Sequence, residues 1–508
     1  MPILETYLAA LRDIRSSGEA VDETSYYVPL ANLFNELGKS LKPKVHCVLT
    51  LKNRGAGIPD GGLFTDEQIK ESKADAKPLP QNPARGVIEV KPTSDDAWIT
   101  ADGPQVTRYW GKYGQVLVTN YRDFVLLGKD PAGNPVKLET YRLADNENDF
   151  WRAAAASKKT AAIHEASFVE FAKRTMLHAA PVAAPEDLAW FLASYARDAL
   201  HRISLHELPA LANVRKALEE ALGLTFEGEK GEHFFRSTLV QTLFYGVFSA
   251  WVLWSKQHPP KIVIQSEAKN LSSPPPLFDW RLTSHFLRVP VLRKLFHEVA
   301  EPGQLDKLNL SEILDWTSAV LNRVDRPAFF SKFQEAHAVQ YFYEPFLQAF
   351  DPELRKQLGV WYTPPEIVQY MVARVDAVLR EELGLADGLA DKNVYVLDPC
   401  CGTGSYLVEA LKRIHQTLQE RGGDALIAAD LKEAAKNRVF GFEILPAPFV
   451  VAHLQLGLLL QNLGAPLAEK GSDRVGIFLT NALTGWELRD QPPLVWPEME
   501  ASARVPAK

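Results

Sequence analysis

One stretch of the sequence, residues 394–406, does most to limit what this chain can fold into. Its β-branched residues run directly into a glycine turn and then into a helical pattern, in the order Val-Tyr-Val-Leu-Asp-Pro-Cys-Cys-Gly-Thr-Gly-Ser-Tyr. Gly402 and Gly404 lack side chains, so the backbone of the turn can approach a ligand closely. The helix that follows supplies unpaired N–H groups, and Asp398 can accept a hydrogen bond from an amine or a hydroxyl. The stretch therefore predicts a ligand-binding loop between a strand and a helix.

The sequence around this loop alternates between helices and strands. We expect helices at 365–383 and 405–420, and strands at 394–398 and 439–443. Such alternation predicts a parallel, doubly wound sheet. Glu443 ends the second strand, where a carboxylate is well placed to accept hydrogen bonds from both hydroxyls of a ribose.

These segments resemble the class I, S-adenosylmethionine-dependent amino methyltransferases that act on adenine in DNA. The loop at Asp398 resembles motif I of that family, and Val439-Phe-Gly-Phe-Glu-Ile444 resembles motif II. Ile477-Phe-Leu-Thr-Asn-Ala-Leu483 resembles motif III, although the family commonly has aspartate where this chain has asparagine. Gly359-Val-Trp-Tyr-Thr-Pro-Pro-Glu-Ile-Val368 resembles motif X, and its position before motif I is the gamma order.

The resemblance implies a Rossmann-like methyltransferase sheet that binds S-adenosylmethionine. It places the backbone of the glycine turn around the methionine part of the cofactor, with Asp398 near the ammonium group and Ile444 beside the adenine ring. Thr363 is expected to cap the helix that begins motif X, with two prolines in its first turn. The implied cofactor-binding residues are Tyr362, Thr363, Pro364, Asp398, Pro399, Gly402, Thr403, Gly404, Glu443, Ile444 and Asn481.

One catalytic element of the family is missing from this sequence. Methyl transfer to adenine needs a flipped base, held by a loop of Asp, Asn or Ser followed by Pro-Pro and an aromatic residue. Gln491-Pro-Pro-Leu494 has the prolines but neither the first residue nor the aromatic one. The methyltransferase sheet is therefore expected to be incomplete, as in the front half of a larger enzyme. Alternatively, a separate chain completes the methyltransferase sheet.

A second constellation lies near the N-terminus, where Asp60 follows Gly-Ile-Pro and Glu89 and Lys91 share one strand. Glu89 and Lys91 point to the same face, because side chains alternate along a strand. Asp60 and Glu89 would hold Mg²⁺ through oxygen ligands, and Lys91 would orient the attacking water. Gln105 and Tyr109 follow, one helical turn apart.

Together these residues resemble the PD-(D/E)xK nucleases, including their Gln-x-x-x-Tyr variant. The resemblance implies catalytic roles for all five residues, and Glu23 is expected to add a metal contact. A degenerate or purely structural α/β domain is the alternative interpretation.

Composition and length fit a multidomain α/β protein of 508 residues with a net charge of −7. Its three cysteines cannot form a disulfide framework, so we expect a reducing cytoplasm. The apolar stretch 238–254 is too short to span a membrane and predicts a buried core helix. The expected domains are a small mixed α/β nuclease-like domain at 1–147, a helical connector at 148–337 with a flexible insertion near 256–276, the methyltransferase part at 338–487, and a tail at 488–508.

This order of domains resembles single-chain bacterial restriction–modification enzymes of types IIG, IIL and ISP. It implies adenine methylation joined to an endonuclease, with double-stranded DNA as the partner and S-adenosylmethionine and Mg²⁺ as cofactors. Three alternatives stay open: a nuclease or DNA-binding subunit that only binds the cofactor, a methyltransferase for protein or a small molecule, and a non-catalytic scaffold.

Overall fold

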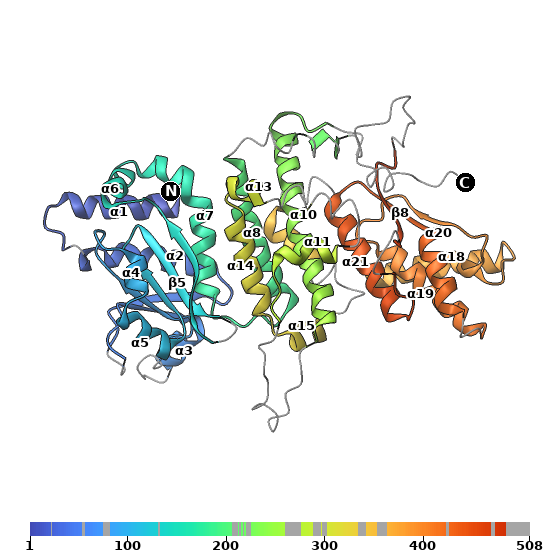
Figure 1. The fold of residues 1–508 in the computed structure, drawn as a ribbon, viewed down its shortest axis with the longest axis horizontal. Helices are drawn as coiled ribbons and strands as arrows, with labels where there is room; N and C mark the ends of the chain where they lie inside the picture. Colours follow the sequence, from blue (N-terminus) through green and yellow to red (C-terminus); the bar gives the residue numbers. More distant parts are fainter. Residues whose placement is uncertain are drawn as a thin grey trace, which may run out of the picture. The chain divides into compact units, whose positions relative to one another are not determined.

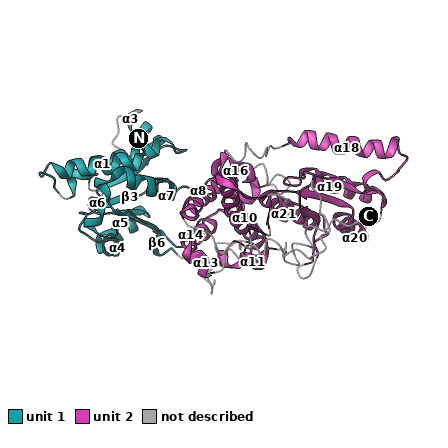
Figure 2. Ribbon diagram, turned by 90° about the horizontal axis from the view of Figure 1, so that it is seen from above, with its two compact units in different colours: residues 1–182, 271–274 teal, residues 183–270, 275–508 magenta. Residues whose placement is uncertain are grey.

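The computed structural model of this chain divides into two compact units (Figure 2). Unit 1 comprises residues 1–182 with 271–274, and unit 2 comprises residues 183–270 with 275–508. The expected domain bounds stay predictions. The structure describes residues 1–21, 23–52, 56–74, 82–130, 133–205, 212, 215–216, 218–219, 225–259, 276–287, 296, 302–333, 342–352, 363–422, 426–468 and 473–483.

Unit 1 is built on a sheet with the strand order β1-β2-β3-β4-β5-β6. β3 and β4 are parallel, and all other neighbours are antiparallel. This mixed sheet confirms the expected mixed α/β architecture, in which β-rich runs at 45–51, 86–90, 116–119 and 124–127 predict four of the strands. The strands are β1 (Val45–Leu49), β2 (Gly61–Thr65), β3 (Val87–Val90), β4 (Val116–Thr119), β5 (Asp123–Lys129) and β6 (Pro135–Arg142).

Helices pack on this sheet in two groups (Figure 1). One group contacts β3, β4 and β5 and buries an apolar core that contains Val106, Tyr109 and Val118. In the other group, the helix Tyr27–Lys39 packs on β1, the helix Ser157–Leu177 packs on β6, and the helix Ile3–Ser16 contacts both of these helices. The first group is α4 (Ala97–Ala101) and α5 (Pro104–Tyr113), and the second is α1 (Ile3–Ser16), α2 (Tyr27–Lys39), α6 (Glu147–Ala155) and α7 (Ser157–Leu177).

The polar composition of the segment 65–85 predicts a surface excursion or a long hairpin tip, and that prediction is wrong for its first part, which is the helix α3 (Asp66–Ala74). Its start is capped reciprocally. The Thr65 N–H donates to Oε1 of Gln68 at 3.1 Å, and the Gln68 N–H donates to the Thr65 hydroxyl at 3.4 Å. The composition suggested a loop, but the capping residues specify a helix.

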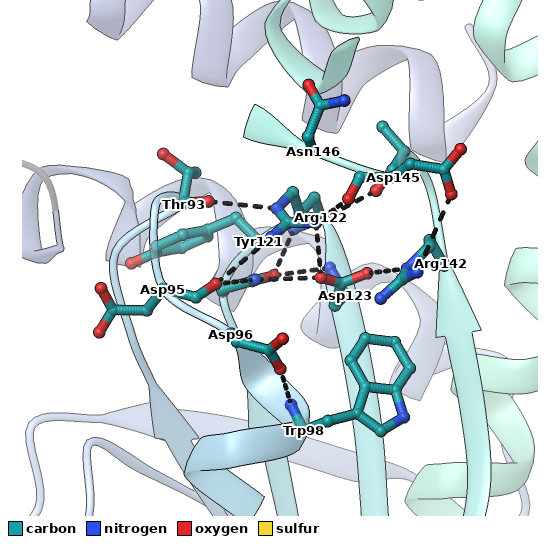
Figure 3. A network of polar contacts seen from close by, with 12 residues as sticks. Thr93, Asp95, Asp96, Trp98, Tyr121, Arg122, Asp123, Arg142, Asp145 and Asn146 are labelled. Atoms are coloured by element: carbon teal, nitrogen blue, oxygen red, sulfur yellow. Dashed lines mark hydrogen bonds and ion pairs between the residues drawn. The ribbon is translucent and has the colours of Figure 1, made fainter. Parts of the chain in front are cut away.

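A buried arginine fixes the loop that follows β3 (Figure 3). Nε of Arg122 donates to the Thr93 carbonyl at 3.1 Å, and Nη1 donates to the Asp145 carbonyl at 3.1 Å. Arg122 also pairs at 2.8 Å with Asp123, which in turn pairs at 2.9 Å with Arg142 on β6. These bonds tie the carboxyl end of β3 to the β5–β6 hairpin, and so hold rigid the strand that carries Glu89.

Unit 2 begins with a helical layer around α10 (Gly228–Gln257). Most of α10 is buried, including every apolar residue of the stretch 238–254 except Leu253, so the predicted core helix is confirmed. In the described parts of the chain, no helix is both long and apolar enough to cross a membrane. The other helices of this layer are α8 (Pro185–Ser204), α11 (Thr283–Phe286), α13 (Pro302–Lys307), α14 (Ser311–Asn322), α15 (Arg326–Lys332) and α16 (Glu344–Phe350).

The rest of unit 2 contains three parallel strands in the order β7-β8-β9. The expected helix–strand alternation is therefore confirmed. The elements are α18 (Pro365–Glu381), β7 (Val396–Asp398), α19 (Ser405–Glu420), α20 (Ile427–Asn437), β8 (Val439–Glu443), α21 (Pro446–Asn462) and β9 (Gly476–Leu479). Residues 260–275 of the expected insertion and the tail at 488–508 lie outside the described residues.

The start of α18 differs from the expectation at Thr363. The cap position is occupied by Pro364, and no side chain caps the helix. The reason is steric, because a residue that precedes a proline is pushed out of the helical region. Pro364 precedes Pro365 and has ψ of 138°, so Pro364 takes the cap position expected for Thr363, while the helix begins at Pro365 as expected.

Candidate functional sites

Two carboxylates meet at the end of β3 in unit 1. The Glu89 side chain is 1% exposed and accepts a hydrogen bond at 2.6 Å from Nζ of Lys91. Asp60, which precedes β2, accepts a hydrogen bond at 2.7 Å from the backbone N–H of Val90. Pairing of β2 with β3 thus brings three predicted residues together, here called the Asp60–Glu89–Lys91 cluster.

The electrostatics of this cluster suit a divalent cation. Burial raises the pKa of Glu89 to about 7, and the nearby Asp60 carboxylate also raises it, while Lys91 acts in the opposite direction. Oε2 of Glu89 is buried and has no hydrogen-bond partner within the described protein. A carboxylate oxygen without a donor, beside a second carboxylate, is the kind of ligand that Mg²⁺ takes. The residues present therefore fit a magnesium ion held by Asp60 and Glu89.

Tyr27 is a member of this site that the sequence analysis missed. Its hydroxyl donates to Oδ1 of Asp60 at 2.8 Å and lies 3.1 Å from Oε1 of Glu23. Glu23 and Tyr27 are four residues apart, and that spacing was the available signal. Among the residues that the structure describes, no three His, Cys, Asp or Glu side chains converge as a metal site. A metal contact from Glu23 therefore stays a prediction.

Gln105 and Tyr109 lie one turn apart on α5, as their spacing indicated. Nε2 of Gln105 donates to the Tyr109 hydroxyl at 3.1 Å. Burial raises the pKa of Tyr109, and the charges of Glu89 and Asp60 add to that effect. The pair therefore lies within the electrostatic field of the Asp60–Glu89–Lys91 cluster.

The glycine turn of unit 2 has the backbone that its sequence suggested. Gly402 and Gly404 have φ of 55° and 89°, in the left-handed region that favours glycine. A Cβ at Gly402 would meet nothing within 4 Å, whereas one at Gly404 would lie 3.1 Å from Leu456 and 3.3 Å from Ala452 on α21. The turn is therefore open on one side and closely packed against α21 on the other.

Three polar residues follow the carboxyl ends of the three parallel strands. Asp398 ends β7, Glu443 ends β8, and Asn481 follows β9. Oδ1 of Asp398 accepts from the Cys400 N–H at 3.1 Å, while its buried Oδ2 has no partner within the described protein. Burial raises the pKa of Asp398 and of Glu443, and Glu443 accepts from the Leu445 N–H at 2.7 Å. This edge of the sheet thus presents a buried acceptor that lacks a donor.

The other predicted cofactor residues surround this edge to different degrees. Thr363 and Pro364 precede α18, which packs on α19, the helix that begins after the glycine turn. Gln455, which the sequence analysis missed, donates from α21 to the Thr403 carbonyl at 3.0 Å. Tyr362 lies outside the described residues. Pro399 is exposed, and Thr403 and Ile444 are half-buried.

Comparison with known proteins finds a family model that matches the part of the chain containing this second site. Residues 334–471 match the N-6 DNA methylase family. This methylase segment contains every predicted cofactor residue except Asn481. The chain is also 31% identical over 111 residues to the type I restriction enzyme EcoEI methylase subunit of Escherichia coli. That alignment covers 20% of this chain and 19% of the subunit, so the chain spans about a fifth of the relative's length.

Solved structures give weaker likenesses. The superposition on a chain of the DrdV–DNA complex covers 95% of this chain and 40% of that chain, with 18% sequence identity and a TM-score of 0.35. A second superposition is on the ATP-dependent type ISP restriction–modification enzyme LlaBIII bound to DNA. It covers 68% of this chain and 20% of that chain, with 16% sequence identity and a TM-score of 0.38. TM-scores below 0.5 do not establish a shared fold.

The methylase segment has solvent-exposed apolar side chains beside its sheet. Tyr395 and Leu397 on the β7 side are 52% and 53% exposed. On α18, Ile367, Met371 and Val375 are also exposed and recur at helical spacing along one stripe. Among the described strands, β7 pairs only with β8, so one of its edges is open.

Proposed function

We propose that this chain is the cofactor-binding part of an adenine-N6 DNA methyltransferase of a restriction–modification system, joined to a Mg²⁺-dependent endonuclease domain. One observation carries the methyltransferase proposal. The segment that matches the N-6 DNA methylase family also contains a glycine turn and two carboxylates, a half-buried one at Asp398 and a buried one at Glu443, at the same edge of a parallel sheet. The sequence identity to a type I methylase subunit supports the same function.

Each residue of the sheet edge has a role toward S-adenosylmethionine, which supplies an electrophilic methyl group when bound. Oδ2 of Asp398 lacks a donor, so it fits an ammonium group. Gly402 leaves open space beside the turn for the methionine part. Glu443 accepts backbone N–H groups, and its remaining lone pairs can accept from ribose hydroxyls. Ile444 lies beside the base, and Asn481 offers an amide to it.

The catalytic loop must come from elsewhere, because the tetrapeptide that holds the target adenine is absent from this sequence. We propose that further α/β sequence, in the same polypeptide or in a separate chain, completes the site. No described strand pairs with the second edge of β7, and Tyr395 and Leu397 are exposed; both observations support this arrangement, since an unpaired strand edge readily takes another strand.

For the nuclease, we propose that Asp60 and Glu89 hold Mg²⁺ and that Lys91 orients the water that attacks the phosphodiester. Tyr27 donates to Asp60 and so fixes the carboxylate that would bind the ion. Gln105 is exposed, so its amide can contact DNA, and the buried Tyr109 accepts a hydrogen bond that positions this amide. The measured hydrogen bonds of the cluster carry this part of the proposal.

Two assays test the proposal. Tritiated S-adenosylmethionine is incubated with plasmid DNA and with the chain completed by the sequence that supplies the catalytic loop, and the labelled product is identified by nucleoside analysis. Label in N6-methyladenine supports the methyltransferase, and label in protein or a small molecule contradicts it. In the second assay the plasmid is incubated with Mg²⁺, and Lys91→Ala is expected to abolish cutting. Undiminished cutting would rule out the assigned nuclease site.

A second function is favoured by the missing tetrapeptide. In it, the chain is a Mg²⁺-dependent nuclease or DNA-binding subunit whose methylase segment only binds the cofactor. It predicts saturable cofactor binding and Mg²⁺-dependent cutting without any transfer of label. The two assays above therefore separate the two functions.

A further inference from the structure

The helix α5 presents a polar face to solvent beside the proposed nuclease site. On this face, Gln105 and Arg108 are exposed and Lys112 is half-buried. The three residues are three and four positions apart, so their side chains lie along one side of the helix. Tyr109 points the other way, into the apolar core of unit 1. Arg108 and Lys112 therefore extend a row of polar side chains that begins at Gln105.

The beginning of this row adjoins the segment that carries Asp60. Nε2 of Gln105 donates to the Tyr109 hydroxyl at 3.1 Å, and a Cβ at Gly57 would lie 3.2 Å from the same hydroxyl. Gly57 is three residues before Asp60, so the segment that leads to this carboxylate packs directly on Tyr109. The row thus starts at the nuclease site and continues along α5 for about 10 Å, at 1.5 Å per residue.

The charge of this face favours an anionic partner. No acidic residue occurs from 103 to 122, although the whole chain has a net charge of −7. Asp102, the acidic residue just before this stretch, is paired with Lys137 at 2.7 Å. Arg108 and Lys112 form no ion pair with any residue that the structure describes. Their positive charges are therefore available to a ligand from solvent.

The spacing of the two cations suits a phosphodiester backbone. Arg108 and Lys112 are one helical turn apart, about 6 Å along the helix axis. Each strand of double-stranded DNA carries one phosphate per about 3.4 Å of its axis. Two long cationic side chains at this spacing can therefore contact phosphates one or two nucleotides apart. Gly111 is exposed, and a Cβ there would meet nothing within 4 Å, so the surface beside the row is open to the DNA.

We propose that this face of α5 binds the phosphate backbone of double-stranded DNA next to the position where the strand is cut; the inference rests on the proposed endonuclease function. Arg108 and Lys112 each contact one phosphate, and the amide of Gln105 contacts the strand nearest the metal position. Contacts to phosphates fix the position of the strand and carry no sequence information. The face therefore places DNA of any sequence at the nuclease site.

The test is fluorescence anisotropy of a short labelled duplex with the full chain, without divalent cations so that the DNA is not cut. Each phosphate contact contributes about 0.9 to the slope of log affinity against log salt concentration. Arg108→Ala and Lys112→Ala should each make the slope shallower by about 0.9, and the double variant by about 1.8, equally for two unrelated sequences. Arg108→Lys keeps the charge and should keep the wild-type slope.

Lys158→Ala is the matched control, because it removes the same charge from an exposed position on α7. The helices α5 and α7 cover opposite faces of the sheet. Phe124 on β5 packs on Phe168 of α7, with ring centroids 5.2 Å apart, whereas the next residue, Val125, lies in the core beneath α5. Lys158→Ala should therefore keep the wild-type slope. Alanine is a better helix former than arginine or lysine, so none of these substitutions is expected to unfold its helix.

Plasmid cutting with Mg²⁺ is the second measurement. At about 0.15 M salt the double variant should raise KM about thirtyfold, the change that two lost phosphate contacts give relative to 1 M salt. Its kcat should stay at the wild-type value, because neither cation touches the reacting atoms. Unchanged slopes in the double variant, an equal change in Lys158→Ala, or a fall in kcat at constant KM would each overturn the inference alone. A wild type that does not bind duplex DNA would overturn the proposed endonuclease as well.

Discussion

The Glu89→Gln variant should be more stable than the wild type at pH 8, although it removes a proposed metal ligand. Burial beside Asp60 raises the pKa of Glu89 from 4.5 to about 7 in the folded protein. Between these values the folded state keeps a proton that the unfolded state has lost. The contribution of Glu89 to the free energy of unfolding is therefore fully present below about pH 4.5 and is lost as the pH rises to about 7. Because glutamine does not titrate, the Glu89→Gln variant keeps this part of its stability as the pH rises.

The size of the effect follows from the difference between the two pKa values. At about 1.36 kcal/mol per pKa unit, the difference corresponds to about 3 kcal/mol of unfolding free energy at pH 8. The Glu89 side chain is 1% exposed, so solvent does little to reduce this value. The amide of the glutamine can also donate to Asp60, whereas Lys91 is partly exposed and can turn to water.

Urea denaturation at pH 5 and pH 8, without Mg²⁺, measures this prediction. The wild type should lose about 2–3 kcal/mol between the two pH values relative to Glu89→Gln. Glu36→Gln, on an exposed face of α2, is the matched control and should behave as the wild type. Mg²⁺ at pH 8 should stabilise the wild type but not Glu89→Gln. An equal pH dependence of Glu89→Gln and wild type would refute the reasoning.

Three further predictions concern single side chains. Gly404→Ala, at φ of 89° against α21, should lower S-adenosylmethionine affinity about tenfold by calorimetry. Gly422→Ala, at φ of 71° in open space, should lose only stability. Tyr27→Phe removes a hydrogen bond to Asp60 and should slow Mg²⁺-dependent plasmid cutting by at least tenfold, without unfolding by circular dichroism. Asp376→Asn, at a fully buried site, should cost about 2–4 kcal/mol in urea denaturation. Although burial acts to raise it, bonds from Leu389 and two arginines lower the pKa of Asp376, so wild-type stability should fall below about pH 4.

Local patterns in the sequence predicted the elements of the methylase segment well. The helix at 405–420 and the strand at 439–443 have the bounds that were expected. Both depend on signals within the segment itself, namely glycines before the helix and a short apolar run of valine and phenylalanine that ends at Glu443. By contrast β2 contains Gly61 and Gly62, which are poor strand formers, and it exists because it pairs with β1 and β3.

The membership of the sites was harder to predict than their elements. Asp60, Glu89 and Lys91 carried a recognisable pattern, and the structure brings them together. Gln455 carried no such pattern and Tyr27 only its spacing from Glu23, because the contacts of Tyr27 with Asp60 and of Gln455 with Thr403 join residues far apart in the sequence. Such contacts depend on how α2 and α21 pack, and packing is not encoded in any short motif.

The central claim is that the glycine turn and the strand ends of the methylase segment bind S-adenosylmethionine. Equilibrium binding of the radiolabelled cofactor to the chain tests it most directly, with S-adenosylhomocysteine and NAD as competitors. The account predicts one site per chain, competed by S-adenosylhomocysteine and not by NAD. No saturable binding, or equal competition by NAD, would contradict it.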